Sequence, residues 1–360
     1  MYILHHINIY KQREFKRIMA TKKEEDKEEI KEKKEEKEEK KETKLTDLPG
    51  IGPAVASKLE AAGVYDLMGL AVMSPSELAE LAGVGEAVAR KSIQAARKMM
   101  DLGFQDGMEY AKKRLEVKNI TTGSKNLDNL LGGRGVETKS ITEAFGAYGS
   151  GKTQLGLQLT VNVQLPIDKG GANGKAVFID TEGTFRPERI RQISEAVGAN
   201  PEKVLKNIFV ARAFNADHQI LLIDKIGEMV KNGEPIKLVV VDSLTAHFRA
   251  EFSGRGQLAD RQQKLNRYLH NLMKMAEQFN LAVYVTNQVM ANPAMMFGDP
   301  TVAVGGNIVG HASTYRIYLR RGKKDSRVAK LIDSPNLPDG ETIFFLTTAG
   351  IKDPVGSDED

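Results

Sequence analysis

The sequence predicts an α/β fold in which a mostly parallel, helix-covered sheet follows a small all-α domain. Two patterns lead to this prediction. From Ala176 onward, short β-branched runs alternate with amphipathic stretches, as in sheets that are buried on both faces. Before them, residues 45–100 carry Leu, Val and Ala at helical spacing. Ligands of parallel sheets bind at the carboxyl ends of the strands, so we expect the chemistry there.

The expected strands are four apolar runs at 176–179, 238–241, 281–286 and 315–319, which read AVFI, LVVV, LAVYVT and YRIYL. A core-facing helix is expected between the second and third strands, because apolar side chains recur there at intervals of three or four residues. These side chains are Leu265, Leu269, Leu272, Met273, Ala276 and Phe279. Strand therefore alternates with helix, as a parallel sheet requires.

Length and composition exclude several classes of protein. At about 150 residues per domain, 360 residues correspond to roughly two domains. The absence of cysteine excludes disulfides, thiolate zinc sites and cysteine nucleophiles, and the six histidines show no metal-ligand spacing, so we expect no zinc. The net charge of +4 permits an anionic partner without demonstrating one. No apolar run reaches the ~18–20 residues of a membrane span, so we expect a cytoplasmic protein without a membrane partner.

The first 44 residues are predicted to be a charged, disordered tail. Between Lys22 and Lys44 there are ten Lys and eleven Asp or Glu, and Ile30 is the only apolar residue. Such a segment cannot build a core. A solvated single helix held by Glu–Lys pairs is the alternative.

Residues 45–100 contain two similar glycine turns, at 48–52 and 81–85. Each is expected to join two short helices in a tight hairpin with outward-facing amides, which resembles the tandem helix-hairpin-helix DNA-binding module. The turn amides would hold a DNA phosphate, and nearby cations would add attraction: Lys58, Arg90, Lys91 and Arg97. A protein-interaction or packing domain is the alternative.

A phosphate-binding loop follows the strand-like run 140–145 and opens a helix near Gln154. Residues 146–153 match G-x-x-x-x-G-K-[ST] at every fixed position. The expected ATP-binding residues are Gly146, Ala147, Tyr148, Gly149, Ser150, Gly151, Lys152, Thr153 and Gln154. Lys152 is expected on the β and γ phosphates, and Thr153 on Mg²⁺.

Two carboxylates complete the predicted ATPase site. Asp242 ends the apolar run 238–241 and is the expected second Mg²⁺ ligand. The next residue is Ser243, so the catalytic carboxylate must come from elsewhere. Glu182 lies just beyond the run 176–179, within reach of a water attacking the γ phosphate. Its alternative is a structural loop carboxylate.

Several long motifs identify the family that the chain resembles, the archaeal RadA recombinases of the RecA family. They include TTGSKNLDNLLGG, FGAYGSGKTQ, IDTEGTFRPER, VVVDSLTAHFR and LIDSPNLPD. The resemblance implies a RecA-like P-loop ATPase core at 119–360, with ATP between neighbouring subunits. It implies that Arg189 lies against the adenine, that Asp333 and Pro338 cap the neighbour's nucleotide, and that His311 approaches its γ phosphate. A monovalent cation such as K⁺ near Asp333 is left open.

Two segments after strands are expected to bind DNA. The first, at 248–261, is interpreted as a mobile polar loop with Arg249, Phe252, Arg255 and Arg261. The second, at 290–308, carries Met296, Phe297, Gly305, Gly306 and Asn307, where apolar groups would wedge between bases. A disordered surface insertion is the alternative for each. Gln288, between the last strand and the second segment, matches the RecA-family residue that couples the γ phosphate to DNA.

The linker at 101–118 is expected to carry the polymerisation motif. By resemblance, Phe104 inserts into the next subunit beside the small residues Ala211 and Ala213. The family commonly has Ala where this chain has Gly107, which puts the affinity of the contact in doubt. A head-to-tail contact of this kind that does not close produces a helical filament, and rings without DNA are left open.

The resemblance implies a DNA-dependent ATPase that forms filaments on single-stranded DNA and exchanges strands with a homologous duplex. Accessory recombination proteins are its further expected partners, and its expected localisation is the nucleoid. Two alternatives remain: a recombination mediator or paralogue that binds ATP without exchanging strands, and a closed-ring helicase or circadian-type ATPase.

Overall fold

The computed structural model describes residues 45–61, 64, 67–99, 104–252, 254–291 and 301–354. The chain forms two compact units, Met1–Phe104 and Gln105–Asp360, which are described separately. The predicted tail at 1–44 lies outside the described residues, as do Met296 and Phe297.

The described part of the first unit is helical. Its elements are η1 (Leu45–Asp47), α2 (Pro53–Ala61), α3 (Leu67–Ala71), α4 (Pro75–Ala82) and α5 (Glu86–Met99). Leu59, Leu70 and Leu78 are fully buried in its core. The Ser74 hydroxyl accepts a hydrogen bond from the Glu77 amide at 3.2 Å and so caps the start of α4.

The two predicted glycine turns lie before α2 and between α4 and α5. Gly50 has a φ of +84°, and a Cβ there would lie 2.3 Å from Cγ1 of Val88. Glycine is therefore required for the first turn to pack on α5.

The cations that the sequence assigns to DNA attraction divide into two pairs. Lys58 donates to the carbonyl of Ala82 at 3.4 Å, and Nε of Arg97 donates to the carbonyl of Ala71 at 2.7 Å. These two side chains thus join helices of their own unit. Arg90 and Lys91 are exposed on α5.

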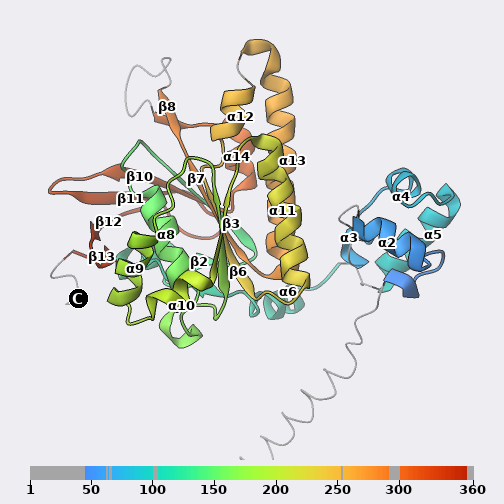
Figure 1. Cartoon of the computed structure of the whole chain (residues 1–360), viewed down its shortest axis with the longest axis horizontal. Coiled ribbons are helices and arrows are strands. Elements are labelled where there is room, and N and C mark those ends of the chain that lie inside the picture. Colours follow the sequence, from blue (N-terminus) through green and yellow to red (C-terminus); the bar gives the residue numbers. More distant parts are fainter. Residues whose placement is uncertain are drawn as a thin grey trace, which may run out of the picture. The chain divides into compact units, whose positions relative to one another are not determined.

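The second unit contains a nine-stranded sheet in the described residues, with the order β13-β12-β11-β10-β3-β7-β6-β4-β5 (Figure 1). The strands from β10 to β5 in this order run parallel, and β11, β12 and β13 extend the sheet antiparallel. The bounds are β3 (Ser140–Phe145), β4 (Lys175–Asp180), β5 (Ile208–Arg212), β6 (Ile236–Asp242), β7 (Ala282–Asn287), β10 (Tyr315–Arg321), β11 (Ser326–Asp333), β12 (Gly340–Thr347) and β13 (Gly350–Lys352). The predicted α/β fold is confirmed, and the four predicted apolar runs correspond to β4, β6, β7 and β10, with Leu281 just before β7.

Two smaller antiparallel pairs accompany this sheet. They are β1 (Asn119–Ile120) with β2 (Val136–Glu137), and β8 (Val289–Ala291) with β9 (Thr301–Ala303).

Helices cover both faces of the large sheet (Figure 1). One face carries α8 (Lys152–Asn162), α9 (Pro187–Ala196) and α10 (Pro201–Lys206), and the other carries α11 (Ala216–Lys231), α12 (Ala246–Glu251), α13 (Leu258–Phe279) and α14 (Gly306–Ala312). The second unit also contains two short helical elements, α7 (Lys125–Leu130) and η2 (Ile167–Lys169). None of the described helices combines the length and apolar character of a membrane span.

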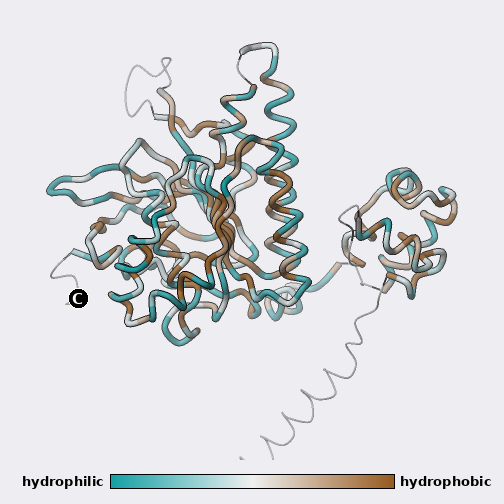
Figure 2. Tube along the Cα trace, viewed as in Figure 1, coloured by the Kyte–Doolittle hydropathy of each residue, from teal (hydrophilic) through white to brown (hydrophobic). Residues whose placement is uncertain are grey.

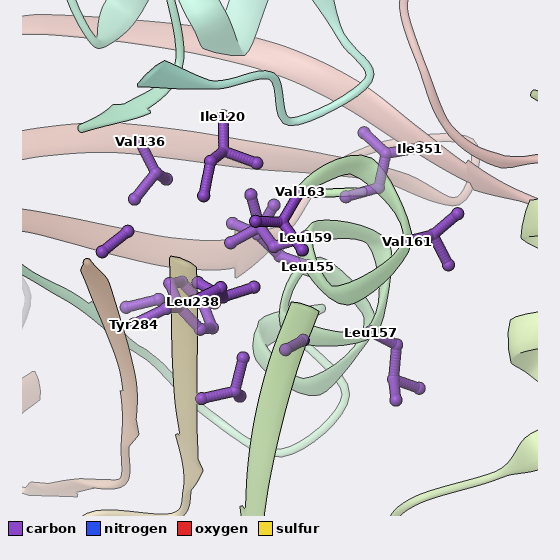
Figure 3. Packing of buried hydrophobic residues seen from close by; sticks show 14 of the residues in the cluster. Ile120, Val136, Leu155, Leu157, Leu159, Val161, Val163, Leu238, Tyr284 and Ile351 are labelled. Atoms are coloured by element: carbon purple, nitrogen blue, oxygen red, sulfur yellow. The ribbon is translucent and has the colours of Figure 1, made fainter. Parts of the chain in front are cut away.

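The alternation of side chains along β6 explains the two apolar cores. Leu238 and Val240 belong to the core on the α8 side, whereas Val239 and Val241 belong to the core on the α13 side. Figure 3 shows Leu238 and Leu155 of α8 in the same cluster of buried side chains. Figure 2 accordingly shows the strands at the centre as strongly hydrophobic. Two buried faces make the central strands continuously apolar in sequence.

A helix, α6 (Gly107–Arg114), occupies part of the predicted linker at 101–118. Oδ1 of Asp106 accepts hydrogen bonds from the amides of Met108 and Glu109 at 2.8 and 2.9 Å. Arg114 forms an ion pair with Glu137 of β2 at 3.0 Å. This segment is therefore part of the second unit.

Candidate functional site

The phosphate-binding loop lies between β3 and α8 and requires glycine at two points. Gly146 and Gly149 have φ values of +156° and +73°. A Cβ would lie 2.0 Å from the carbonyl oxygen of Leu319 at Gly146, and 2.2 Å from Nη2 of Arg321 at Gly149. A side chain at Gly146 would collide with backbone, and the left-handed φ of Gly149 disfavours residues other than glycine, so the two glycines permit the tight turn of a phosphate-binding loop.

The loop borders a cavity of about 770 Å³, within the usual range for a small-molecule site. Every predicted ATP-binding residue from Gly146 to Gln154 lines it except Ser150. The hydroxyl of Ser150 is buried without a hydrogen-bond partner. Because α8 begins at Lys152, its N-terminal amides and positive dipole end lie at the loop, which suits a polyphosphate.

Lys152 curls back over the loop. Its Nζ donates to the carbonyls of Gly146 and Ala147 at 2.8 and 3.0 Å. Burial lowers the pKa of Lys152, while the carboxylates of Asp242 and Glu182 oppose that shift. The ammonium is therefore a desolvated cation between the loop and two carboxylates, where a phosphate would bind strongly.

Asp242 ends β6 and is almost fully buried, with 3% of its surface exposed. Thr184 donates to its Oδ2 at 2.8 Å, and the Thr286 hydroxyl donates to its Oδ1. Burial raises the pKa of Asp242, and hydrogen bonds from Thr286, Thr153 and Thr184 act in the other direction. A buried carboxylate beside the Thr153 hydroxyl fits Mg²⁺, because a hard cation prefers oxygen ligands and offsets the cost of burying the charge.

Glu182 lies on the loop after β4, and Asp180 shapes that loop. Oδ1 of Asp180 accepts hydrogen bonds from the amides of Glu182, Gly183 and Thr184 at 3.1, 2.6 and 3.1 Å. Oδ2 accepts from the Phe185 amide at 3.2 Å. The sequence analysis did not identify Asp180, although a carboxylate at a strand end followed by Thr-Glu-Gly signals such a turn.

A chain of hydrogen bonds leads from the cavity to α12. Oε1 of Glu182 accepts from the Ser243 hydroxyl and from Nε2 of Gln288, both at 2.8 Å. Oε1 of Gln288 in turn accepts from Nη1 of Arg249 at 3.1 Å. The Gln288 carbonyl also accepts from the Val304 amide at 2.9 Å. One glutamine thus connects the cavity carboxylate to both segments predicted to bind DNA.

Residues 113–354 match the family model described as Rad51. The chain belongs to the Rad51 family. Residues 42–98 match the model for a SAM-like helix-hairpin-helix tandem. The chain is 54% identical over 310 residues to the DNA repair and recombination protein RadA of Aeropyrum pernix. The aligned region covers 86% of this chain and 97% of that protein. Rad51-family proteins are DNA-dependent ATPases, so the ATPase prediction and the resemblance to RadA are confirmed.

The other residues that the family resemblance assigns to nucleotide binding do not line the P-loop cavity of their own chain. They are Arg189, His311, Asp333 and Pro338. On α9, Nε of Arg189 donates to Oε1 of Gln154 at 2.8 Å, and its other nitrogens donate to the carbonyls of Thr347 and Thr348. Burial lowers the pKa of Arg189. His311 lines a second cavity of about 510 Å³ between α13 and α14. Asp333 ends β11 and Pro338 precedes β12.

The first predicted DNA segment is more structured than the sequence suggests. Residues 248–261 are not one mobile loop, because α12 extends to Glu251 and α13 begins at Leu258. Phe248 is fully buried, and its ring centroid lies 5.7 Å from that of Tyr268. Only a short link separates the helices.

This arrangement distributes the predicted DNA residues of that segment over several elements. Arg249 lies on α12, Arg255 on the short helix η3 (Arg255–Gln257) and Arg261 on α13. The Phe252 ring follows α12, with Nζ of Lys264 5.2 Å from its centroid.

In the second segment, β8 and β9 form an antiparallel pair on either side of residues 292–300, which lie outside the described part of the chain. Gly305 has a φ of +93° and precedes α14, which contains Gly306 and Asn307. These glycines therefore begin a helix.

The predicted polymerisation residues are divided between surface and core. Phe104 is fully exposed, and Gly107 begins α6. Ala211 lies on β5, at the open edge of the sheet, and is partly exposed. Ala213 follows β5, is 1% exposed and packs in the chain's own core.

Proposed function

We propose that this protein polymerises head-to-tail on single-stranded DNA and exchanges strands with a homologous duplex under the control of ATP. The observation that carries the proposal is the hydrogen-bonded path from Glu182 through Gln288 to Arg249. It gives the ATPase site and a DNA-facing cation a shared side chain, so that either ligand biases the other. The helix-hairpin-helix unit and the relative's printed name agree with DNA recombination.

The residues of the cavity have separate roles in ATP hydrolysis. The loop amides and Lys152 would bind the phosphates, and Thr153 and Asp242 would hold Mg²⁺, which neutralises charge that develops on the phosphates. Glu182 orients the attacking water and accepts its proton. Ser243 and Gln288 fix the Glu182 carboxylate by donating to the same oxygen.

Assembly would complete the nucleotide site from a second subunit. His311, Asp333 and Pro338 do not line the P-loop cavity of their own chain. This placement supports a role toward the neighbour's nucleotide. The open edge of β5, with Val210 45% and Phe214 75% exposed, is the surface we assign to the neighbour's Phe104.

DNA would be held mainly through its backbone. We assign to Arg249, Arg255 and Arg261 the role of supplying cations for the DNA phosphates, and to Gly305, Gly306 and Asn307 contacts with the DNA backbone at the start of α14. Binding should therefore depend steeply on salt and little on sequence. We also propose that the protein acts on nucleoid DNA with accessory recombination proteins.

Electron microscopy with single-stranded DNA and a slowly hydrolysed ATP analogue tests this function. Helical filaments are expected. Closed rings would favour a helicase, and dispersed particles a mediator without strand-exchange activity. A strand-exchange assay with and without ATP completes the test, because equal rates in both would refute the coupling. Comparing ATP hydrolysis in K⁺ and Na⁺ tests a monovalent site at Asp333.

A further inference from the structure

Two arginines line the P-loop cavity from the side opposite the catalytic carboxylates. Arg321 ends β10 and Arg327 lies at the start of β11, and their Cα atoms are paired in the antiparallel ladder. Both side chains line the cavity of about 770 Å³. In the sheet order, β10 and β11 lie on one side of β3, whereas β7, β6 and β4 lie on the other. The loop after β3 is therefore flanked by cations on one side and by Asp242 and Glu182 on the other.

These two arginines differ from the other arginines on the same strands. Arg316 pairs with Glu143 at 2.7 Å, and Arg320 pairs with Glu341 at 2.9 Å. Among the ion pairs of the described residues, Arg321 and Arg327 have no carboxylate partner. Among the described arginines of β10 and β11, the two without a carboxylate partner are thus the two that line the cavity.

Arg327 has a buried donor without an acceptor. Its Nη1 donates to the carbonyls of Asp325 and Ser326 at 2.8 and 2.9 Å, which fixes the guanidinium. Its Nε is buried and has no hydrogen-bond partner. An unsatisfied buried donor on a charged group is costly, so the described residues do not satisfy the hydrogen-bonding capacity of Arg327 by themselves.

Arg321 lies directly over the loop. Its Nε is 3.4 Å from the carbonyl oxygen of Gly149, and a Cβ on Gly149 would lie 2.2 Å from its Nη2. The aliphatic stem of Arg327 lies close to Gly151, because Cγ of Arg327 would be 3.7 Å from a Cβ built on Gly151. The guanidinium of Arg321 and the aliphatic stem of Arg327 therefore approach the phosphate-binding loop.

We propose that Arg321 and Arg327 bind the phosphates that remain in the product nucleotide diphosphate. The inference rests on the proposed nucleotide site. Water attack occurs on the Glu182 side, so cations on the β10 side suit the phosphates that are not transferred. A planar guanidinium matches phosphate oxygens with two parallel donors, which an ammonium cannot do. The two arginines are thus binding residues for ATP and ADP alike.

The test measures dissociation constants of the full-length protein for ADP, a slowly hydrolysed ATP analogue and adenosine by titration calorimetry. Arg321→Gln and Arg327→Gln should each weaken ADP and the ATP analogue by about 10- to 100-fold and leave adenosine unchanged. Arg327→Lys should recover only part of the loss. Arg320→Gln is the matched control, because that neighbour pairs with Glu341 and does not line the cavity.

The outcomes separate the possible failures. If the unmodified protein does not bind ADP, the proposed function itself fails. If it binds ADP and both Gln variants bind ADP equally well, only this inference is overturned. A loss confined to the ATP analogue would also overturn it, because the arginines would then act on the transferred phosphate. Should Arg327→Gln unfold, Arg321→Gln decides, since its side chain has no comparable structural bonds.

Discussion

Replacing Gln288 by Met should uncouple ATP hydrolysis from DNA binding. The change removes the donor to Oε1 of Glu182 at 2.8 Å and the acceptor for Arg249 at 3.1 Å, while it keeps a side chain of similar length. Oε1 of Glu182 retains its hydrogen bond from Ser243, also at 2.8 Å, so the carboxylate stays in place. The rate without DNA should therefore fall less than the rate with DNA.

The size of the effect follows from the lost bonds. A hydrogen bond to a charged group contributes about 1.5–3 kcal/mol, and the exposure of the Gln288 side chain favours the lower end. About 1–1.5 kcal/mol of coupling corresponds to a roughly five- to tenfold smaller stimulation by DNA.

Steady-state ATP hydrolysis with and without single-stranded DNA measures that ratio directly. The matched control is Gln192→Met on α9, which removes an exposed glutamine bonded to Arg189 at 3.0 Å and does not touch Glu182. The control should keep the parental stimulation. If Gln288→Met were stimulated by DNA as strongly as the unmodified protein, the path from Glu182 to Arg249 would carry no coupling and the reasoning would be refuted.

Three further variants test the site. Lys152→Ala should reduce ATP hydrolysis at least about 100-fold with an unchanged melting temperature; hydrolysis at the parental rate would refute the assignment of the loop. Asp242→Asn should abolish Mg²⁺-dependent hydrolysis yet raise the free energy of unfolding of the nucleotide-free protein at neutral pH. Burial raises the folded pKa of Asp242 above its unfolded value, so the folded state favours the neutral form at low pH and loses stability as pH rises through the folded pKa. Denaturant titrations across pH check this sign, and a less stable Asn variant at pH 7 would contradict it. Asp180→Ala should lower the free energy of unfolding by about 2–4 kcal/mol, because the amides of residues 182–185 lose their acceptor; a loss under about 0.5 kcal/mol in thermal denaturation would show that water replaces the carboxylate.

The sequence predicted the sheet well because its central strands are buried on both faces and their apolar runs are unmistakable. It predicted the segment at 248–261 poorly. Arg, Gly and Ser there suggested a mobile loop, whereas Phe248 packs on Tyr268 and holds α12 in place. Local composition could not show that contact, since the two residues are brought together by folding.

The candidate site shows the same division. Spacing and strand context predict Lys152, Thr153 and Asp242 as site residues, and the structure places all three along one cavity. Asp180 was missed because its function is to organise the amides of the loop after β4, which becomes visible only in the hydrogen bonds. The burial of Ala213 in the core was likewise not visible in the sequence, because a small residue is compatible with either surface or core.

By itself the sequence determined the fold class, the family and the residues of the phosphate loop, because these depend on periodicity and on short-range spacing. Only the tertiary structure decided which side chains from different elements are hydrogen-bonded to one another. Glu182, Gln288 and Arg249 are far apart in the chain, and β4, β7 and α12 bring them into one hydrogen-bonded path. Arg321 and Arg327 likewise face the phosphate cradle only because β10 lies beside β3, a neighbourhood that strand order sets and linear spacing does not.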